Sequence, residues 1–297
     1  MKNQLFTGVC TAMVTPFIDG KVNYPLMMRL LQRQIDSGVK TVVICGTTGE
    51  APTLSDHEKI ELFKLSKEFV GDACTVIAGT GSNDTAHSIE LSQQAQEVGV
   101  DAVLVVAPYY NKGNPDGILA HYANIAHSIN IPLIIYNVPS RTGVDIPVSV
   151  YKRLSCIPNI AGVKEASTDI RKTVQIRSTC PESFSVWSGN DDMIVPIMSL
   201  GGQGVISVLS NVCPLETAAM TSAALAGDFQ TAGILQCKLL PLIDLLFKEV
   251  NPIPVKYAMK HLGFDCGQCR LPLGQLSKEN RERFDGFFSA SIKNAII

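Results

Sequence analysis

One lysine stands where an amine can act as a nucleophile. Lys164 closes the apolar run Ile160-Ala-Gly-Val-Lys164, which is typical of a buried strand. Removing a lysine amine from water favours its neutral form, and a neutral amine can attack a carbonyl carbon. The same lysine could instead reach the surface or pair with Glu165. Its role as a nucleophile therefore depends on the residues that end the other apolar runs.

Hydroxyl groups follow three of those other runs. Tyr136 ends the run over residues 133–136, and its phenol could transfer protons while an imine forms or breaks. Considered alone, it could equally be a core tyrosine bonded to a backbone carbonyl. Thr47 and Tyr110 follow two further runs. Together with Tyr136 they favour the catalytic interpretation of Lys164.

Two further positions are suited to holding carboxylate groups. Thr47 and Thr48 lie between glycines, so their loop could bring backbone N–H groups and hydroxyls to a small anion. Arg141 follows a proline turn and offers a planar fork for a second carboxylate. An ordinary threonine turn and a surface ion pair are the structural alternatives.

The sequence gives little support to metal or redox chemistry. The five histidines show no metal-ligand spacing. Cys266 and Cys269 have C-x-x-C spacing without a second pair, and nine scattered cysteines are typical of reduced, buried thiols. Lys112 lies in a Gly/Asn/Pro loop and Lys256 follows a proline-broken segment, so we interpret both as structural or solvated.

The elements that must position these residues repeat along the chain. Apolar runs too short for helices alternate with helical periodicity, at residues 9–14, 41–45, 75–78, 102–106, 133–136, 160–164, 184–187 and 204–208. A capping box from Ser55 to Glu58 opens a predicted helix through residue 69, and residues 84–98 and 116–129 show the same pattern. Eight strands alternating with helices predict an α/β fold, the (β/α)8 TIM barrel, with its chemistry at the carboxyl ends of the strands.

Length and composition are consistent with this barrel. The 297 residues are 46% hydrophobic and 18% charged, and a net charge of −2 gives no basic surface for nucleic acid. The late apolar stretch 239–250 is interrupted by Asp244 and Lys248, so we expect no membrane span and a cytoplasmic location. We predict a barrel catalytic domain over residues 1–227 and a C-terminal helical extension over residues 228–297.

An open doubly wound sheet is the alternative architecture. It would require a phosphate or dinucleotide fingerprint after a strand. The segment Gly79-Thr-Gly81-Ser-Asn-Asp84 departs from G-x-G-x-x-G at Asp84, and no G-x-x-x-x-G-K-[ST] occurs. The barrel is therefore favoured.

Four motifs together resemble the pyruvate-dependent aldolase family that contains the dihydrodipicolinate synthases and N-acetylneuraminate lyase. They are Gly46-Thr-Thr-Gly-Glu50, Tyr136-Asn-Val-Pro-Ser-Arg-Thr-Gly143, Gly162-Val-Lys-Glu-Ala166 and Asn251-Pro-Ile-Pro-Val-Lys256. The resemblance runs from Phe6 to at least Pro272. Its Ser-Arg-Thr-Gly loop is similar to that of the synthases and differs from that of the sialic acid lyases.

The resemblance implies a role for each catalytic candidate. Lys164 forms an imine with pyruvate, and Tyr136 donates and accepts protons. Thr47 links Tyr136 to Tyr110, which reaches over from a neighbouring subunit. No metal or organic cofactor is implied, because the lysine itself is the electron sink. The implied assembly is a homotetramer, a dimer of dimers.

The resemblance also implies the substrates and their contacts. Thr48 binds the carboxylate of pyruvate, with Ile206 and Gly189 beside it, and Arg141 holds the carboxylate of L-aspartate 4-semialdehyde. The condensation belongs to the biosynthesis of diaminopimelate and lysine. A related Schiff-base aldolase or lyase, similar to N-acetylneuraminate lyase or a sugar-acid aldolase, would use another aldehyde. A catalytically silent barrel would bind pyruvate without turnover, and the full set of relay residues argues against it.

Some members of the family carry a feedback site for L-lysine at a subunit interface. Asn83 and Tyr109 match that pattern, whereas four other positions depart from it: Ala51, Asp56, Lys59 and His87. His87 stands where the sensitive members carry a glutamate that pairs with the inhibitor's amino group, and Lys59 adds a repelling charge. The resemblance therefore predicts weak or absent inhibition by L-lysine.

Overall fold

Eight parallel strands close into a barrel. The computed structural model describes residues 5–294, with side chains described for residues 5–290. Around the barrel the strands follow the order β1-β10-β9-β8-β7-β6-β5-β4. Their bounds are β1 Gly8–Ala12, β4 Thr41–Ile44, β5 Thr75–Gly79, β6 Ala102–Val106, β7 Leu133–Asn137, β8 Ile160–Glu165, β9 Ser185–Ser188 and β10 Gly204–Ser207. Nearly all their residues are buried, as expected of strands covered on both faces.

All eight predicted strands are present, and the barrel predicted from them is confirmed. The predicted ends differ from the observed ones by at most two residues. An antiparallel hairpin of β2 Phe17–Ile18 and β3 Lys21–Val22 was not predicted. Strands of two residues are too short to carry an alternating pattern, which is why the apolar periodicity missed them.

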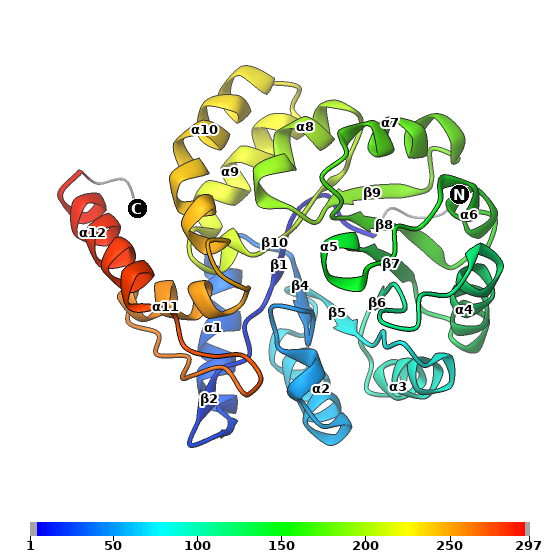
Figure 1. The fold of residues 1–297 in the computed structure, drawn as a ribbon, viewed down its shortest axis with the longest axis horizontal. Helices are drawn as coiled ribbons and strands as arrows, with labels where there is room; N and C mark the ends of the chain where they lie inside the picture. The colour runs from blue at the N-terminus through cyan, green and yellow to red at the C-terminus, as the bar shows by residue number, and fades with distance from the viewer. Residues whose placement is uncertain (1–4, 295–297) are drawn as a thin grey trace.

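A ring of helices covers the barrel (Figure 1). Ser55 caps α2 with the predicted capping box, since its side chain accepts from the backbone N–H of Glu58 and the Glu58 carboxylate accepts from the Ser55 N–H. The helices are α1 Tyr24–Asp36, α2 Asp56–Val70, α3 Thr85–Glu97, α4 Pro115–Ser128, α5 Pro139–Thr142, α6 Val148–Leu154, α7 Ile170–Thr179, α8 Ile194–Ser199, α9 Pro214–Leu225, α10 Phe229–Leu246, α11 Ile253–His261 and α12 Lys278–Asn294.

The last three helices group together on one side of the barrel (Figure 1). Among the helices described, α10 has the length and apolar composition that could cross a membrane. It carries Lys238, Pro241 and Asp244, and it packs along α9 and against α8. These contacts make α10 part of the helical layer over the barrel.

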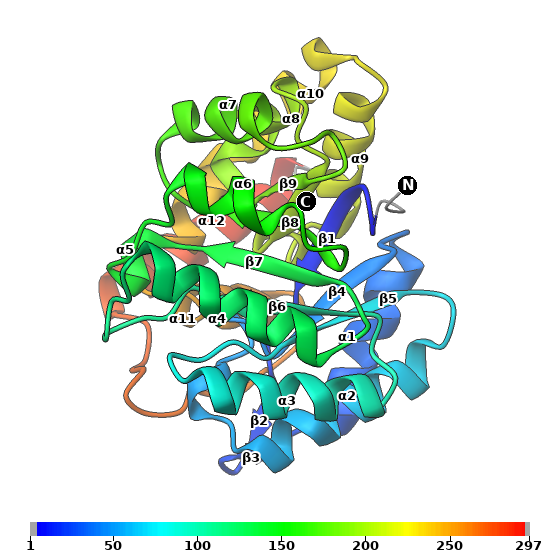
Figure 2. The same ribbon diagram turned by 90° about the vertical axis from the view of Figure 1, so that its right-hand side faces the viewer.

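The inside of the barrel has its own apolar core. Phe6, just before β1, stacks on Trp187 of β9 with ring centroids 4.7 Å apart, and the indole N–H donates to the Phe6 carbonyl at 3.3 Å. Because Phe6 precedes its strand, this pair fills the end at which the strands begin. The polar side chains therefore lie at the opposite end of the barrel, where the strands end and where the carboxyl end of β7 lies beside α5 (Figure 2).

Candidate active site

β7 and β8 bring the amine and the phenol together. Tyr136 and Lys164 are direct register partners, and the Lys164 Nζ lies 4.2 Å from the centroid of the Tyr136 ring. The Lys164 side chain is buried, with 5% of the residue exposed. Among the described residues no carboxylate lies within ion-pair distance of this amine. Packing, and not a partner charge, holds the amine in place.

A register irregularity precedes this pair. Leu133 of β7 lies opposite Ile160 of β8, yet the next residue, Ile134, lies opposite Gly162. β8 therefore carries one extra residue, Ala161, over the same length of sheet. Such bulges re-aim the side chains that follow them.

The next residues along both strands face the surrounding helices. The Asn137 Nδ2 donates to Glu165 Oε1 and to Asp145 Oδ1, each at 2.9 Å. Burial raises the pKa of Glu165 above its ordinary value. Because Glu165 is engaged on this outer face, it is not the partner of Lys164, and that alternative for Lys164 is ruled out.

A cavity of about 520 Å³ opens at the carboxyl ends of β4 to β7. Three predicted site residues line it: Thr47, Tyr136 and Arg141. Sequence reasoning missed other lining residues, including Val138 and Thr142, because apolar and small side chains at strand ends resemble ordinary core. Among the described residues no hydrogen bond joins the Thr47 and Tyr136 hydroxyls directly.

Two further predicted residues belong to the inside of the barrel near Lys164 and Tyr136. A Cβ added to Gly189 would lie 3.2 Å from the Lys164 Cε and 2.6 Å from the Ala166 Cβ, so a side chain there would displace the lysine. Ile206 of β10 is fully buried and belongs to the same inner core as Tyr136. Glycine at position 189 thus makes room for the amine.

The chain segment before α11 contacts both residues predicted to hold carboxylates. Asn251 donates from Nδ2 to Thr48 Oγ1 at 3.0 Å, and its backbone carbonyl accepts from Arg141 Nη2 at 3.2 Å. Thr48 is buried, whereas much of Arg141 is exposed. Asn251 was missed by sequence reasoning because its contacts lie far away along the chain.

A buried ion pair sits behind the same loop. The Lys256 Nζ lies 2.5 Å from Glu50 Oε1, and the backbone N–H of Arg270 donates to Glu50 Oε2 at 2.9 Å. The interpretation of Lys256 as structural is confirmed. Burial raises the pKa of the nearby Cys269 thiol to about 12, so it is a protonated thiol at neutral pH.

Tyr110 does not line the cavity of its own chain. It is 88% exposed and has a left-handed backbone conformation, with φ of 67°. The neighbouring Tyr109 is half-buried and does line the cavity. The structure therefore separates two adjacent tyrosines, one facing the cavity and one facing outward.

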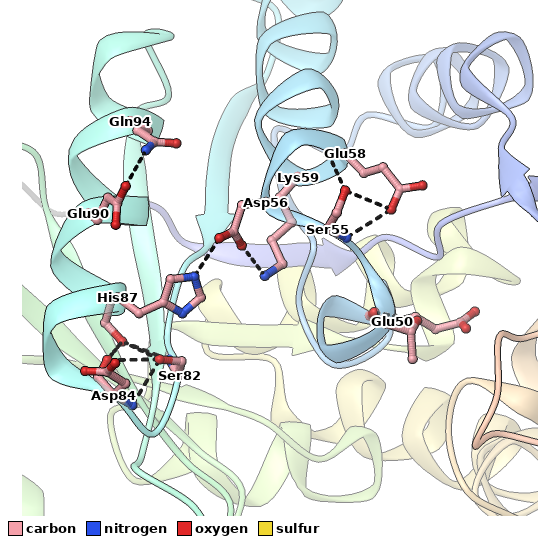
Figure 3. A network of polar contacts seen from close by, with 12 residues as sticks. Glu50, Ser55, Asp56, Glu58, Lys59, Ser82, Asp84, His87, Glu90 and Gln94 are labelled. Atoms are coloured by element: carbon pink, nitrogen blue, oxygen red, sulfur yellow. Dashed lines mark hydrogen bonds and ion pairs between the residues drawn. The ribbon is translucent and has the colours of Figure 1, made fainter.

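Lys59 of α2 and His87 of α3 line the cavity, and Figure 3 shows the polar contacts that join these two helices. Asp56 lies between His87 and Lys59, with its carboxylate 2.8 Å from His87 Nε2 and 3.0 Å from Lys59 Nζ. Burial alone would raise the pKa of Asp56, but the hydrogen bonds and charges of these two partners lower it. Within the described residues no cluster of three or more His, Cys, Asp or Glu side chains has the arrangement of a metal site.

Comparison with known proteins extends over almost the whole chain. The sequence profile of the Dihydrodipicolinate synthetase family matches residues 5–291. The 4-hydroxy-tetrahydrodipicolinate synthase of Acetivibrio thermocellus is 47% identical over 282 residues, covering 95% of this chain and 96% of the relative.

Solved structures give the same result. Dihydrodipicolinate synthase from Aquifex aeolicus superimposes with a TM-score of 0.94 at 40% identity, covering 96% of this chain and 98% of that one. The enzyme from Cyanidioschyzon merolae, crystallised with lysine bound, gives a TM-score of 0.94 at 35% identity, covering 99% and 100%.

Fold, site and relatives lead to one conclusion. In β8 a buried lysine has no paired carboxylate among the described residues, and a tyrosine ring contacts its amine. This arrangement suits imine chemistry. The chain therefore belongs to the dihydrodipicolinate synthetase family, and it is a lyase-type class I aldolase with the synthase function of its relatives.

Proposed function

We propose that the chain condenses pyruvate with L-aspartate 4-semialdehyde, and that Lys164 carries pyruvate as a Schiff base. The observation that carries this proposal is the state of Lys164, whose amine is buried against the Tyr136 ring and has no carboxylate partner among the described residues. An amine that no carboxylate engages is free to attack the carbonyl carbon of a substrate.

The first steps occur at the carbonyl group of pyruvate. The Lys164 amine adds to C2, and the carbonyl oxygen leaves as water to give the imine. Tyr136 supplies a proton for that water, because its ring contacts the amine. Loss of a proton from C3 then gives the enamine. The imine nitrogen accepts the electron pair in this step, so this route needs no cofactor.

The later steps join the two substrates and free the lysine. The enamine carbon attacks the aldehyde carbon of the semialdehyde, and the aldehyde oxygen takes up a proton. The amino group of that substrate then adds to the imine carbon and displaces Lys164 as a heterocyclic ring closes. In this proposal Thr48 holds the carboxylate of pyruvate and Arg141 holds that of the semialdehyde. Gly189 and Ile206 shape the space around the imine.

We further propose that Tyr110 completes the site of a neighbouring subunit in a homotetramer, with Thr47 between it and Tyr136. An exposed aromatic side chain in a left-handed backbone conformation is unusual, which supports a role outside its own chain. Mixing Lys164→Ala subunits with Tyr110→Phe subunits would create hybrid sites with both groups intact. Recovered activity would support sharing, and inactive hybrids would contradict it.

A cytoplasmic location, with neither nucleic acid nor membrane as a partner, is part of the same proposal. All nine cysteines are free thiols, as is usual in a reducing compartment. The net charge of −2 offers no general attraction to nucleic acid or anionic lipid.

L-lysine is expected to inhibit this enzyme weakly or not at all. Asp56 already engages both Lys59 and His87 beside the cavity, and the Lys59 ammonium disfavours a second ammonium there (Figure 3). Adding L-lysine to a steady-state assay tests this expectation. An inhibition constant in the micromolar range would contradict it.

The proposed reaction is tested by turnover of both substrates. NADPH oxidation by added dihydrodipicolinate reductase reports the product, and it should require pyruvate, the semialdehyde and Lys164. Loss of signal in Lys164→Ala supports the assignment. Wild-type protein that forms an imine with pyruvate but does not turn over the semialdehyde would point to an aldolase with another aldehyde. Pyruvate binding without imine formation would point to a silent barrel.

A further inference from the structure

Asn251 contacts both side chains that we propose to hold substrate carboxylates. Its Nδ2 lies 3.0 Å from Thr48 Oγ1, and its backbone oxygen lies 3.2 Å from Arg141 Nη2. Asn251 is 5% exposed and stands 203 residues from Thr48 in the chain. The segment before α11 therefore reaches back to the substrate end of the barrel.

The contact with Thr48 decides which way its hydroxyl proton can point. A threonine hydroxyl has one proton to donate and lone pairs to accept with, whereas an amide NH₂ can only donate. Asn251 Nδ2 therefore occupies a lone pair of Thr48 Oγ1 and leaves the proton free. A carboxylate can only accept, so it requires a donor in this place.

The loop that carries Thr48 is attached to α11 at a second point. Glu50, two residues after Thr48, pairs with Lys256 of α11, and both side chains are almost fully buried. Two attachments between the same two segments fix their relative position. Asn251 is thus held at a set distance and angle from the Thr48 hydroxyl.

Stability alone does not explain an amide at position 251. The Asn251 Oδ1 is buried, and it has no hydrogen-bond partner among the described residues. Burying a carbonyl oxygen without a hydrogen-bond partner costs stability, which points to a role for this amide beyond folding.

We propose that Asn251 is a positioning residue that turns the Thr48 hydroxyl proton toward the carboxylate of pyruvate. The backbone carbonyl of Asn251 accepts one hydrogen bond from the Arg141 guanidinium. The other N–H groups of Arg141 remain available to the second substrate. This inference rests on the proposed function, since it assumes that Thr48 binds pyruvate.

The test replaces the donor by an acceptor of the same shape. In Asn251→Asp the new carboxylate accepts the Thr48 proton, which is then lost to pyruvate. We expect the KM for pyruvate to rise roughly 10- to 100-fold, the value of a hydrogen bond to a charged group. At saturating pyruvate, kcat should change by less than about threefold, because the lost contact serves binding.

Two internal readouts separate orientation from general damage. The KM for the semialdehyde should stay within about threefold, because the backbone carbonyl that holds Arg141 is unchanged in the variant. Lowering the pH protonates the new carboxylate and restores a donor, so the raised KM for pyruvate should fall toward the wild-type value. A structural defect would show neither pattern.

Two further variants guard against misfolding. Asn251→Ala removes the donor without adding an acceptor, so its KM for pyruvate should lie between those of wild type and Asn251→Asp. Asn280→Asp disturbs another amide contact near the C-terminal helices, that of Asn280 Nδ2 with Glu249 at 2.6 Å, and should leave the KM unchanged.

The outcomes distinguish this inference from the proposed function. Wild-type protein that forms no imine with pyruvate would overturn the proposed function itself. Active wild type with an unchanged KM in Asn251→Asp would overturn the role of Asn251 alone. An equal rise in Asn280→Asp, or a larger rise in Asn251→Ala than in Asn251→Asp, would also overturn it.

Discussion

Lys164 and Lys256 are equally buried but differ in their charged surroundings. Each is 5% exposed, and each amine lies 4.2 Å from the centroid of an aromatic ring, Tyr136 for Lys164 and Phe17 for Lys256. Lys256 also has Glu50 at 2.5 Å, whereas Lys164 has no such partner among the described residues. Burial and ring contact are shared, so the counter-charge is the difference.

The difference suggests a rule for which buried lysine of a barrel can react as a nucleophile. A third buried lysine, Lys172, is paired with Asp145 on the outer face. A partner carboxylate stabilises the ammonium and withholds the lone pair that a nucleophile needs. Lys164 is a buried amine without such a partner among the described residues, and it is the one that we propose as the nucleophile.

The largest expected effect concerns which amine reacts. Borohydride reduction with pyruvate present should fix the adduct on Lys164 and leave Lys256 and Lys172 unmodified, as read by peptide mass spectrometry. Lys164→Met should lower turnover by at least about 10³-fold while the fold is retained. A pyruvate adduct on Lys256 would contradict the view that a carboxylate partner makes a buried lysine unreactive.

The ring beside Lys164 carries a hydroxyl group, whereas the ring beside Lys256 does not, and the role of this hydroxyl is the next point to test. Tyr136→Phe keeps the ring contact but removes the phenol, and we expect kcat to fall by about 10² or more because proton transfer is lost. Slow imine trapping on Lys164 should persist. The matched change Tyr122→Phe affects a buried tyrosine in the helix-facing core and should leave kcat near its wild-type value.

Removing the paired amine should lower stability far more than it lowers kcat. Lys256→Met leaves the Glu50 carboxylate buried without its partner, and the free energy of unfolding should fall by about 3 to 5 kcal/mol. Adding Glu50→Gln should recover part of this loss, whereas the exposed Lys260→Met should cost little. Equal stability of Lys256→Met and wild type in denaturant titrations would count against a structural pair.

A smaller and pH-dependent effect is expected at the neighbouring ion pair. Arg270 hydrogen-bonds to Glu58 and lowers the pKa of its carboxyl to about 2. This stability is present above the ordinary carboxyl pKa and is lost as the pH falls through the folded value. Glu58→Gln should cost about 1.5 to 3 kcal/mol at neutral pH, and the gap to wild type should close in acid. Glu68→Gln, exposed on the same helix, serves as the control.

Sequence patterns predicted the barrel well because its strands are buried on both faces. Runs such as that ending at Lys164 are continuously apolar, and Ser55 with Glu58 marks the start of α2 by local hydrogen bonds. Tyr136, Thr47 and Arg141 could be assigned to one cavity because parallel strands end at one edge.

Contacts between residues far apart in the chain could not be predicted from local sequence patterns. Asn251 and Glu50 each lie within a motif that was noted, yet their partners Thr48 and Lys256 are some 200 residues away. No periodicity or spacing encodes which loop a C-terminal segment will touch. The outward position of Tyr110 likewise depends on its backbone conformation, which residue type alone does not fix.

The extra residue at Ala161 makes the site depend on how two strands pair as well as on which residues they carry. If β8 kept all its residues but paired with β7 without the bulge, Val163 would lie opposite Tyr136, and Lys164 would fall at the next position, where Glu165 now binds Asn137. A slip of one residue in the pairing would thus put a valine in place of the amine inside the barrel without any change of sequence. Correct strand register during folding is therefore a condition for the proposed chemistry.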